Sequence, residues 1–162
     1  MKLFLTMNSP IGSLTIVSSG KRIIGLEFGE GVETQNLKKA EEDALLVEAK
    51  RQLLEYFDGK RKVFQLPIFL KGTEFQRKVW NELLHIPYGE TRSYQEIAAA
   101  IGNKNAVRAV GQANKANPIP IIIPCHRVIG KNSQLTGYAG KQIDKKAILL
   151  ELEKTSLFMT VF

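Results

Sequence analysis

Residues 93–115 read SYQEIAAAIGNKNAVRAVGQANK, and this segment predicts two short helices joined by a tight turn. Ser93 and Glu96 have the spacing of a capping box, in which a hydroxyl and a carboxylate satisfy backbone donors at a helix start. Gly102 suits the left-handed residue that ends the first helix, and a second helical pattern begins at Ala106. This is the pattern of a helix-turn-helix, although any small helical hairpin shares it.

The second of these helices is expected to expose a basic face. At 100° per residue, Arg108, Gln112 and Lys115 fall in one polar stripe, while Val107 and Val110 lie on the other side. Small residues beside the stripe allow close approach to a nucleic-acid backbone, and the positive charges neutralise phosphates. Solvated charges on an ordinary exposed helix give the same pattern, so the stripe favours DNA contact without excluding a structural role.

The sequence before this region changes its hydrophobic period. Residues 2–28 give three short strand-like runs separated by turns, which is typical of an antiparallel meander. From Leu37 to Phe57 apolar residues recur at helical spacing, and we expect one helix to cover a face of that sheet. Residues 60–72 are expected to form a linker with some extended structure.

Together these patterns predict an α+β fold. A second capping box, Thr73 with Gln76, begins a helix expected to run to about His85. We therefore expect a small N-terminal antiparallel sheet with a helix, followed by a mainly helical C-terminal domain with a winged-helix-like helix-turn-helix. The domains are predicted at residues 1–70 and 71–162.

Composition limits the partners and the compartment. The chain has 162 residues with 23 Lys and Arg against 16 Asp and Glu, and its net charge of +7 favours a polyanionic partner, whether DNA, RNA or an acidic membrane. One Cys and two His exclude an internal disulfide and a structural zinc site of four such ligands, so we expect no metal. The start MKLFLTMNSP is too short for a signal-peptide core, and no apolar stretch approaches a membrane span. A reduced thiol and a cytoplasmic location are expected.

The single cysteine lies in IPIIIPCHRVIG, residues 119–130, directly before His126. A thiol attacks as the thiolate, so a reactive Cys125 needs a neighbouring base or a positive field. Adjacent side chains of a strand point to opposite faces, so His126 can act on Cys125 only where the backbone turns, and Pro124 favours such a turn. An inert buried cysteine is the commoner alternative.

The pentapeptide PCHRV, with RAVGQANKANP upstream of it, resembles the O6-alkylguanine-DNA alkyltransferases, also called methylated-DNA-protein-cysteine methyltransferases. The resemblance continues through GYAG to LLELE and covers about residues 73–153. It implies repair of O6-alkylguanine by irreversible, stoichiometric transfer of the alkyl group to Cys125, after the damaged nucleotide has been flipped out of the duplex. It implies double-stranded DNA as partner, no cofactor and no membrane, and we expect a monomer.

The resemblance also assigns catalytic roles. Cys125 matches the alkyl acceptor, His126 the general base that reaches it through a water molecule, and Glu153 the carboxylate that orients His126. Tyr94 matches the tyrosine that donates to the leaving base. Asn117 matches the asparagine that fixes the turn carrying the cysteine.

Substrate-binding positions follow from the same resemblance. Arg108 matches the residue that fills the space left by the extruded nucleotide, and Tyr138 matches a wall of the base pocket. The other expected positions are Ala139, Gly140, Val128, Gln112 and Lys115. The chain departs from the family where Lys141 replaces a glycine and where LLELE aligns only with one extra residue, so Glu151 competes with Glu153.

Two other classes of function stay open. The first is a DNA-binding module without chemistry, against which the presence of Cys125 in PCHRV argues. The second is a thiol hydrolase built on Cys125 and His126. Such an enzyme commonly takes its histidine from a distant part of the chain. The other histidine, His85, lies at a predicted helix end, where a capping or packing role is expected instead.

Overall fold

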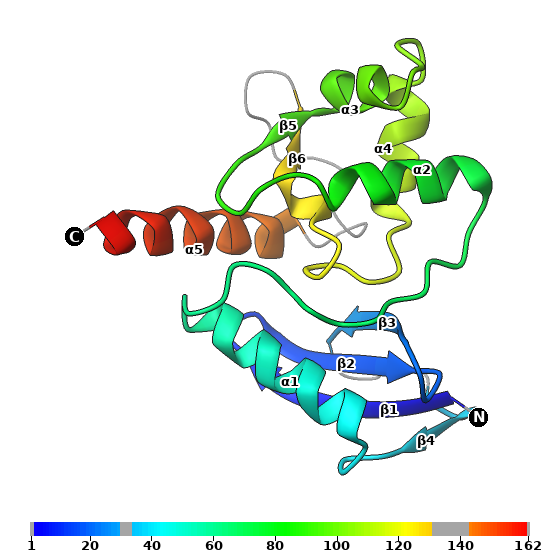
Figure 1. Cartoon of the computed structure of the whole chain (residues 1–162), viewed down its shortest axis with the longest axis vertical. Coiled ribbons are helices and arrows are strands. Elements are labelled where there is room, and N and C mark those ends of the chain that lie inside the picture. Colours follow the sequence, from blue (N-terminus) through cyan, green and yellow to red (C-terminus); the bar gives the residue numbers. More distant parts are fainter. Residues whose placement is uncertain (1, 30–33, 131–142, 162) are drawn as a thin grey trace. The chain divides into compact units, whose positions relative to one another are not determined.

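The computed structural model describes residues 2–29, 34–130 and 143–161, and it divides into two compact units, Met1–Lys71 and Gly72–Phe162 (Figure 1). The architecture belongs to the expected α+β class. Within the described residues, no helix has the length and apolar character that would let it cross a membrane.

The N-terminal unit is a four-stranded sheet with one helix packed on it (Figure 1). Strands β1 (Lys2–Ser9), β2 (Gly12–Ser18) and β3 (Ile23–Phe28) form the predicted antiparallel meander. Strand β4 (Leu37–Lys39) pairs parallel with β1, so the sheet is mixed and has the order β3-β2-β1-β4. Helix α1 (Ala44–Phe57) packs on β1 and β2.

The helix predicted over Leu37–Phe57 is shorter than expected, because it begins only at Ala44. Asp43 caps it, and the Asp43 side chain accepts a hydrogen bond from the Leu46 amide at 3.0 Å. The residues before this cap instead gain backbone hydrogen bonds at the free edge of β1. Edge pairing therefore outweighs the helical spacing of their apolar side chains.

The core of this unit follows from the strand register. Leu5 lies opposite Ile16 and Met7 lies opposite Leu14, so these four side chains share one face of the sheet. All four are buried. Helix α1 contributes further buried residues, namely Leu46, Ala49, Leu53 and Tyr56.

The segment expected as a linker is largely hydrogen-bonded to the N-terminal unit. The side-chain amide of Gln52 donates to the Gln65 carbonyl at 3.1 Å and accepts from the Gln65 amide at 2.9 Å. Further along, the Ile23 amide donates to the Pro67 carbonyl at 2.8 Å, and the Phe69 amide donates to the Ile23 carbonyl at 3.0 Å. The chain is thus anchored to this unit as far as Phe69.

Three short helices build the helix-turn-helix part of the C-terminal unit: α2 (Glu74–Leu83), α3 (Tyr94–Ala100) and α4 (Val107–Lys115). Both predicted capping boxes are confirmed at the starts of α2 and α3. Gly102, with φ of 79°, follows α3 in the predicted left-handed conformation. Local capping chemistry therefore sets where α2 and α3 begin, whereas α4 follows Ala106 without a side-chain cap.

Trp80 joins α2 to α4. Its indole nitrogen donates to the Ala113 carbonyl at 2.8 Å in a buried environment. The backbone of Gly72, just before α2, lies directly against this indole ring. A Cβ at Gly72 would be 2.6 Å from the ring. Only glycine leaves room for that close approach.

The remaining elements surround the cysteine. A 3₁₀ turn, Cys125–Arg127, runs into β6 (Val128–Ile129), which pairs parallel with β5 (Arg92–Ser93). Helix α5 (Ile143–Val161) packs against the 3₁₀ turn. The cysteine is therefore held between the helix-turn-helix and the last helix.

Candidate functional site

Cys125 lies in a turn, as a productive Cys125–His126 pair requires. Pro124, with φ of −79° and ψ of 63°, forms an inverse γ-turn that the Cys125 amide closes by donating to the Ile123 carbonyl at 2.7 Å. The Arg127 amide then donates to the Pro124 carbonyl at 3.0 Å. Because the backbone curls here, Cys125 and His126 are not forced to opposite faces, and both are buried.

A carboxylate from α5 contacts the histidine. Glu153 Oε2 lies 2.5 Å from His126 Nε2, in a fully buried environment. The competing Glu151 is exposed and accepts from the Thr155 hydroxyl at 3.4 Å. Of the two glutamates left open by the sequence, Glu153 is thus the one bonded to His126.

Arg127 binds the same carboxylate and was not assigned a role from the sequence. Its Nε donates to Glu153 Oε1 at 2.9 Å and its Nη2 donates to Glu153 Oε2 at 3.1 Å. Its Nη1 donates to the Ile86 carbonyl at 2.8 Å, and the Gly89 amide donates to Glu153 Oε1 at 3.0 Å. A buried arginine needs such partners. The sequence signal that could have indicated a role for Arg127 was its position close to the cysteine in PCHRV.

These contacts set the protonation states of Glu153 and His126. Burial alone would raise the pKa of Glu153, but hydrogen bonds from His126 and Arg127 outweigh it and hold that pKa below its usual range. Burial lowers the pKa of His126 despite the contact with Glu153. An ionised carboxylate can only accept, so the His126 Nε2–H donates to Glu153 and Nδ1 carries the lone pair of a neutral imidazole.

The thiol itself is protonated at rest. Burial raises the pKa of Cys125 to about 12, although a hydrogen bond to Asn117 and the charge of Lys146 oppose this shift. At neutral pH a thiol with this pKa needs a base before it can attack. The neutral imidazole of His126 is a neighbouring group with that capacity.

Lys146 is a second buried cation that the sequence analysis missed. Its ammonium donates to the Val128 carbonyl and lies 5.9 Å from the centroid of the Tyr94 ring. Burial lowers its pKa to about 8. Lys146 and Glu153 lie about two helical turns apart and so share one face of α5, and this spacing was a signal that could have pointed to Lys146.

Asn117 ties down the segment before the cysteine. Its side-chain amide donates to the Ile123 carbonyl at 2.8 Å and accepts from the Ile119 amide at 2.9 Å. The structure therefore brings Asn117 together with Cys125, His126 and Glu153.

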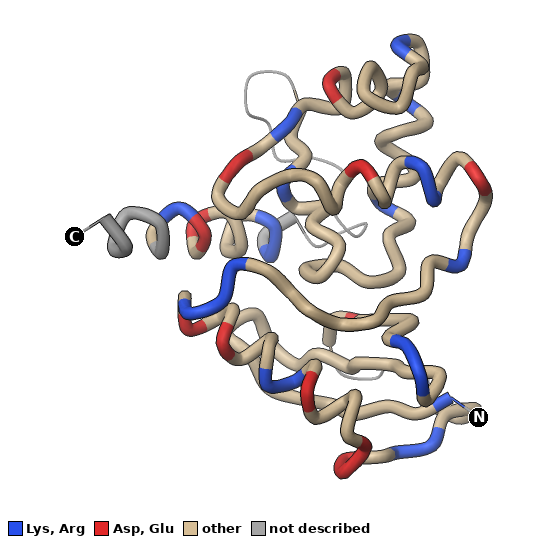
Figure 2. The backbone as a smooth tube through the Cα atoms, viewed as in Figure 1, with Lys and Arg blue, Asp and Glu red and all other residues tan. Residues whose placement is uncertain are grey.

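The exposed face of α4 has the predicted composition. Arg108, Gln112 and Lys115 are exposed, while Val110 and Asn114 are buried. The C-terminal unit holds 12 Lys and Arg against 7 Asp and Glu, and its acidic residues lie on elements other than α4 (Figure 2). Helix α4 itself carries Arg108 and Lys115 and contains no Asp or Glu.

The remaining predicted residues are only partly described. Tyr94 is half-buried at the start of α3, and Val128 is buried with its carbonyl bonded to Lys146. Tyr138, Ala139 and Gly140 lie outside the described residues. Within residues 2–29, 34–130 and 143–161, no three His, Cys, Asp or Glu side chains gather as metal ligands.

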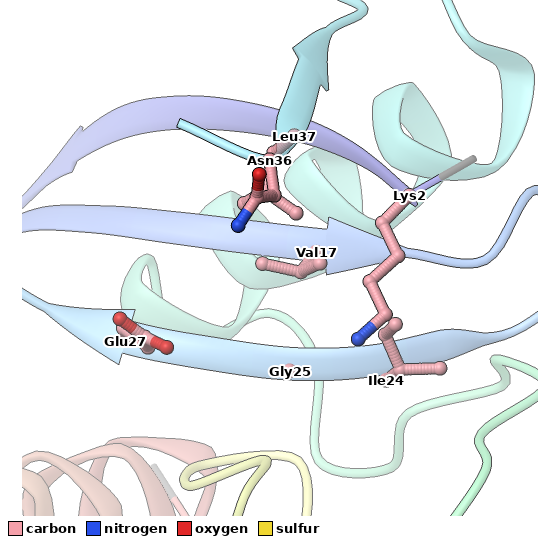
Figure 3. Close-up of a pocket in the computed structure, with 7 residues that line it drawn as sticks. All are labelled: Lys2, Val17, Ile24, Gly25, Glu27, Asn36 and Leu37. Carbon is pink, nitrogen blue, oxygen red and sulfur yellow. The ribbon is translucent and has the colours of Figure 1, made fainter. Parts of the chain in front are cut away.

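The N-terminal unit has a hollow of a different character. A pocket of about 590 Å³ lies over its sheet (Figure 3). Its lining consists of Lys2, Val17, Ile24, Gly25, Glu27, Asn36 and Leu37. Since none of these is a cysteine or histidine, nucleophilic chemistry of the kind expected at Cys125 has no counterpart there.

Comparison with known proteins finds similarity over most of the chain. The models of the 6-O-methylguanine DNA methyltransferase DNA-binding and ribonuclease-like domains match residues 74–155 and 3–70. The constitutive methylated-DNA–protein-cysteine methyltransferase of Bacillus subtilis is 52% identical over 161 residues, covering 96% of this chain and 98% of that protein. The methylated-DNA–protein-cysteine methyltransferase of Methanosarcina barkeri is 47% identical over 153 residues, covering 93% and 96%.

A solved structure is similarly close. The crystal structure of Mycobacterium tuberculosis OGT in complex with DNA matches with a TM-score of 0.88 and 47% identity, over 95% of this chain and 94% of that one. The similarity thus spans both units of the chain. We conclude that the chain belongs to the 6-O-methylguanine DNA methyltransferase family.

Proposed function

We propose that this protein repairs DNA by transferring the alkyl group of O6-alkylguanine to its own Cys125. The observation that carries the proposal is the buried cluster of Cys125, His126 and Glu153. In it a protonated thiol is next in sequence to a neutral imidazole, which is hydrogen-bonded to the carboxylate. The names of the relatives, which are methylated-DNA–protein-cysteine methyltransferases, support the same reaction.

The reaction begins with activation of the thiol. His126 Nδ1 takes the Cys125 proton through a water molecule, and Glu153 stabilises the resulting imidazolium. The thiolate attacks the alkyl carbon, so a carbon–sulfur bond forms as the carbon–O6 bond breaks. The bonding electrons remain on guanine, which takes a proton from the Tyr94 hydroxyl because an unprotonated purine anion leaves poorly.

The product explains why the transfer occurs once. A thioether offers water no carbonyl to attack, unlike the acyl-thioester of a cysteine hydrolase. Cys125 therefore keeps the alkyl group, and each chain acts once.

Duplex DNA is the proposed partner, with α4 as the contact helix. An alkylated base inside the stack lies out of reach of Cys125, so the nucleotide must rotate out of the duplex, and Arg108 fills the space it leaves. The exposed basic face of α4 supports this role. So does the relative from Mycobacterium tuberculosis that was crystallised with DNA.

The test is mass spectrometry of the intact protein after incubation with an oligonucleotide that contains O6-methylguanine. We expect one added methyl group, on the tryptic peptide that contains Cys125, and none on the Cys125→Ser variant, which should still bind DNA. Methyl groups removed in excess of the protein added would overturn the proposal in favour of a thiol hydrolase. A methyl group on another residue would also overturn it.

We also propose a domain boundary between residues 70 and 71 and a cytoplasmic location as a monomer. The family models, which match residues 3–70 and 74–155, support the boundary. A reduced Cys125 and a DNA substrate support the location. Limited trypsin digestion should cut first after Lys71 and leave two stable fragments.

A further inference from the structure

The buried side of α4 carries a polar residue that the proposed reaction does not use. Asn114 is fully buried, whereas Arg108 on the same helix is exposed, and the Asn114 side-chain amide donates to the Cys125 carbonyl at 3.3 Å. Burying an amide is unfavourable unless it is hydrogen-bonded, whereas an apolar residue fills such a position without this requirement. The residue type is therefore accounted for by the bond to the cysteine segment.

Asn114 lies near Asn117, which follows two residues after the end of α4. Asn117 donates to the Ile123 carbonyl at 2.8 Å, and that carbonyl also accepts from the Cys125 amide. The two asparagines thus hold the carbonyls on both sides of Pro124. They fix the turn that presents the thiol at two points of its backbone.

The segment they hold is conformationally strained. Ile121, with φ of 75°, is the one residue other than glycine that has a positive φ within the described parts of the chain, and it is buried. A β-branched residue rarely adopts this conformation, which persists only where surrounding contacts over-determine it. The path of the chain into Cys125 therefore depends on tertiary contacts.

We propose that Asn114 is a positioning residue for alkyl transfer, and the inference rests on the proposed function. By holding the Cys125 carbonyl, Asn114 fixes the thiol relative to α4. The exposed face of that helix carries Arg108, so one rigid element sets the position of the sulfur relative to the bound DNA. A displacement of about 1 Å at a reacting atom can cost about a hundredfold in rate.

The test is single-turnover methyl transfer by Asn114→Leu, which keeps the branched shape of the side chain but removes the donor. We expect the rate constant at saturating DNA to fall by about tenfold or more, equal to about 1.4 kcal/mol of activation free energy. The amplitude should remain one methyl group per chain, and the DNA concentration at half-saturation should not change. A purely structural role would instead lower the amplitude, because unfolded chains transfer nothing.

Val110→Ala provides the matched control. Val110 is buried on the same side of α4, one turn earlier, and has no polar group with which to bond Cys125. This variant should melt at a lower temperature and keep the wild-type rate constant. Asn114→Ala serves with the same measurements where the leucine variant does not fold.

The outcomes separate this inference from the function on which it rests. Wild-type rate constants in the Asn114 variants, or a change confined to amplitude or to half-saturation, would overturn the positioning role alone. Failure of the wild-type protein to accept a methyl group would overturn the proposed function, and this inference with it.

Discussion

The guanidinium of Arg127 spans both carboxylate oxygens of Glu153, with Nε 2.9 Å from Oε1 and Nη2 3.1 Å from Oε2. The arginine therefore compensates the charge that would otherwise favour a protonated His126. Burial then decides the state of the imidazole and lowers its pKa. The histidine stays neutral, which is the state that the proposed general base requires, while its bond to Glu153 holds the ring.

Glu153→Gln should impair both reaction and fold. Loss of the charge that stabilises the imidazolium should slow transfer by about a hundredfold or more. Leaving the buried Arg127 without a counter-charge should cost about 3–5 kcal/mol of unfolding free energy. Single-turnover rates and urea denaturation measure the two effects. Glu151→Gln is the matched control, and an equal loss in that exposed variant would contradict the role of Glu153.

The rate of transfer should be insensitive to mild acid. Because burial lowers the pKa of His126 below its usual 6.5, the base stays neutral at pH 6.5 and becomes protonated only at lower pH. The single-turnover rate constant should therefore fall only below pH 6.5. A decline that is already complete above pH 6.5 would show that the histidine has a raised pKa and would contradict this assignment.

Stability should depend on Lys146 at alkaline pH. Its pKa is lowered from 10.5 to about 8 in the fold, so between these values the unfolded chain binds the additional proton. The contribution of Lys146 to the free energy of unfolding must then rise with pH across that window. Between about pH 8 and 10.5, the unfolding free energy of the wild type should rise relative to that of Lys146→Met in urea denaturation. The difference between the two should be constant below pH 8. A difference that shrinks or stays flat across the window would be the opposing result.

Arg108→Ala should distinguish extrusion from chemistry. Only the duplex requires rotation of the nucleotide, so transfer from duplex DNA should slow far more than transfer from the free alkylated base. Rates with both substrates provide the comparison. Lys21→Ala removes the same charge from an exposed turn of the other unit and should leave both rates unchanged. Equal losses on the two substrates for Arg108→Ala would indicate an ordinary structural or phosphate contact.

The parts of the fold that depend on residues close together in sequence could be predicted. The capping boxes at Thr73 and Ser93 depend on side chains three residues apart, and both helices begin where they indicate. Strand β4 was missed because its pairing with β1 joins segments far apart in sequence. No local pattern distinguishes Leu37 on an edge strand from Leu37 on a helix.

The site divides in the same way. The turn at Pro124 could be expected from the residue type, and the proximity of Cys125 and His126 followed from it. Arg127 and Lys146 were missed because a basic residue is ordinarily solvated, and only tertiary burial gives it a partner inside the protein. The catalytic roles of Cys125, His126 and Glu153 stay predictions, as does the DNA-binding role of Arg108.

The bond from Trp80 to Ala113 gives the molecule an internal optical probe. Trp80 is the sole tryptophan of the chain, so its emission reports one buried place, the contact between α2 and α4. Ala113 precedes Asn114, whose amide bonds the cysteine segment. Intrinsic fluorescence should therefore follow DNA docking on one side of α4 and alkylation on the other in real time, without any attached label.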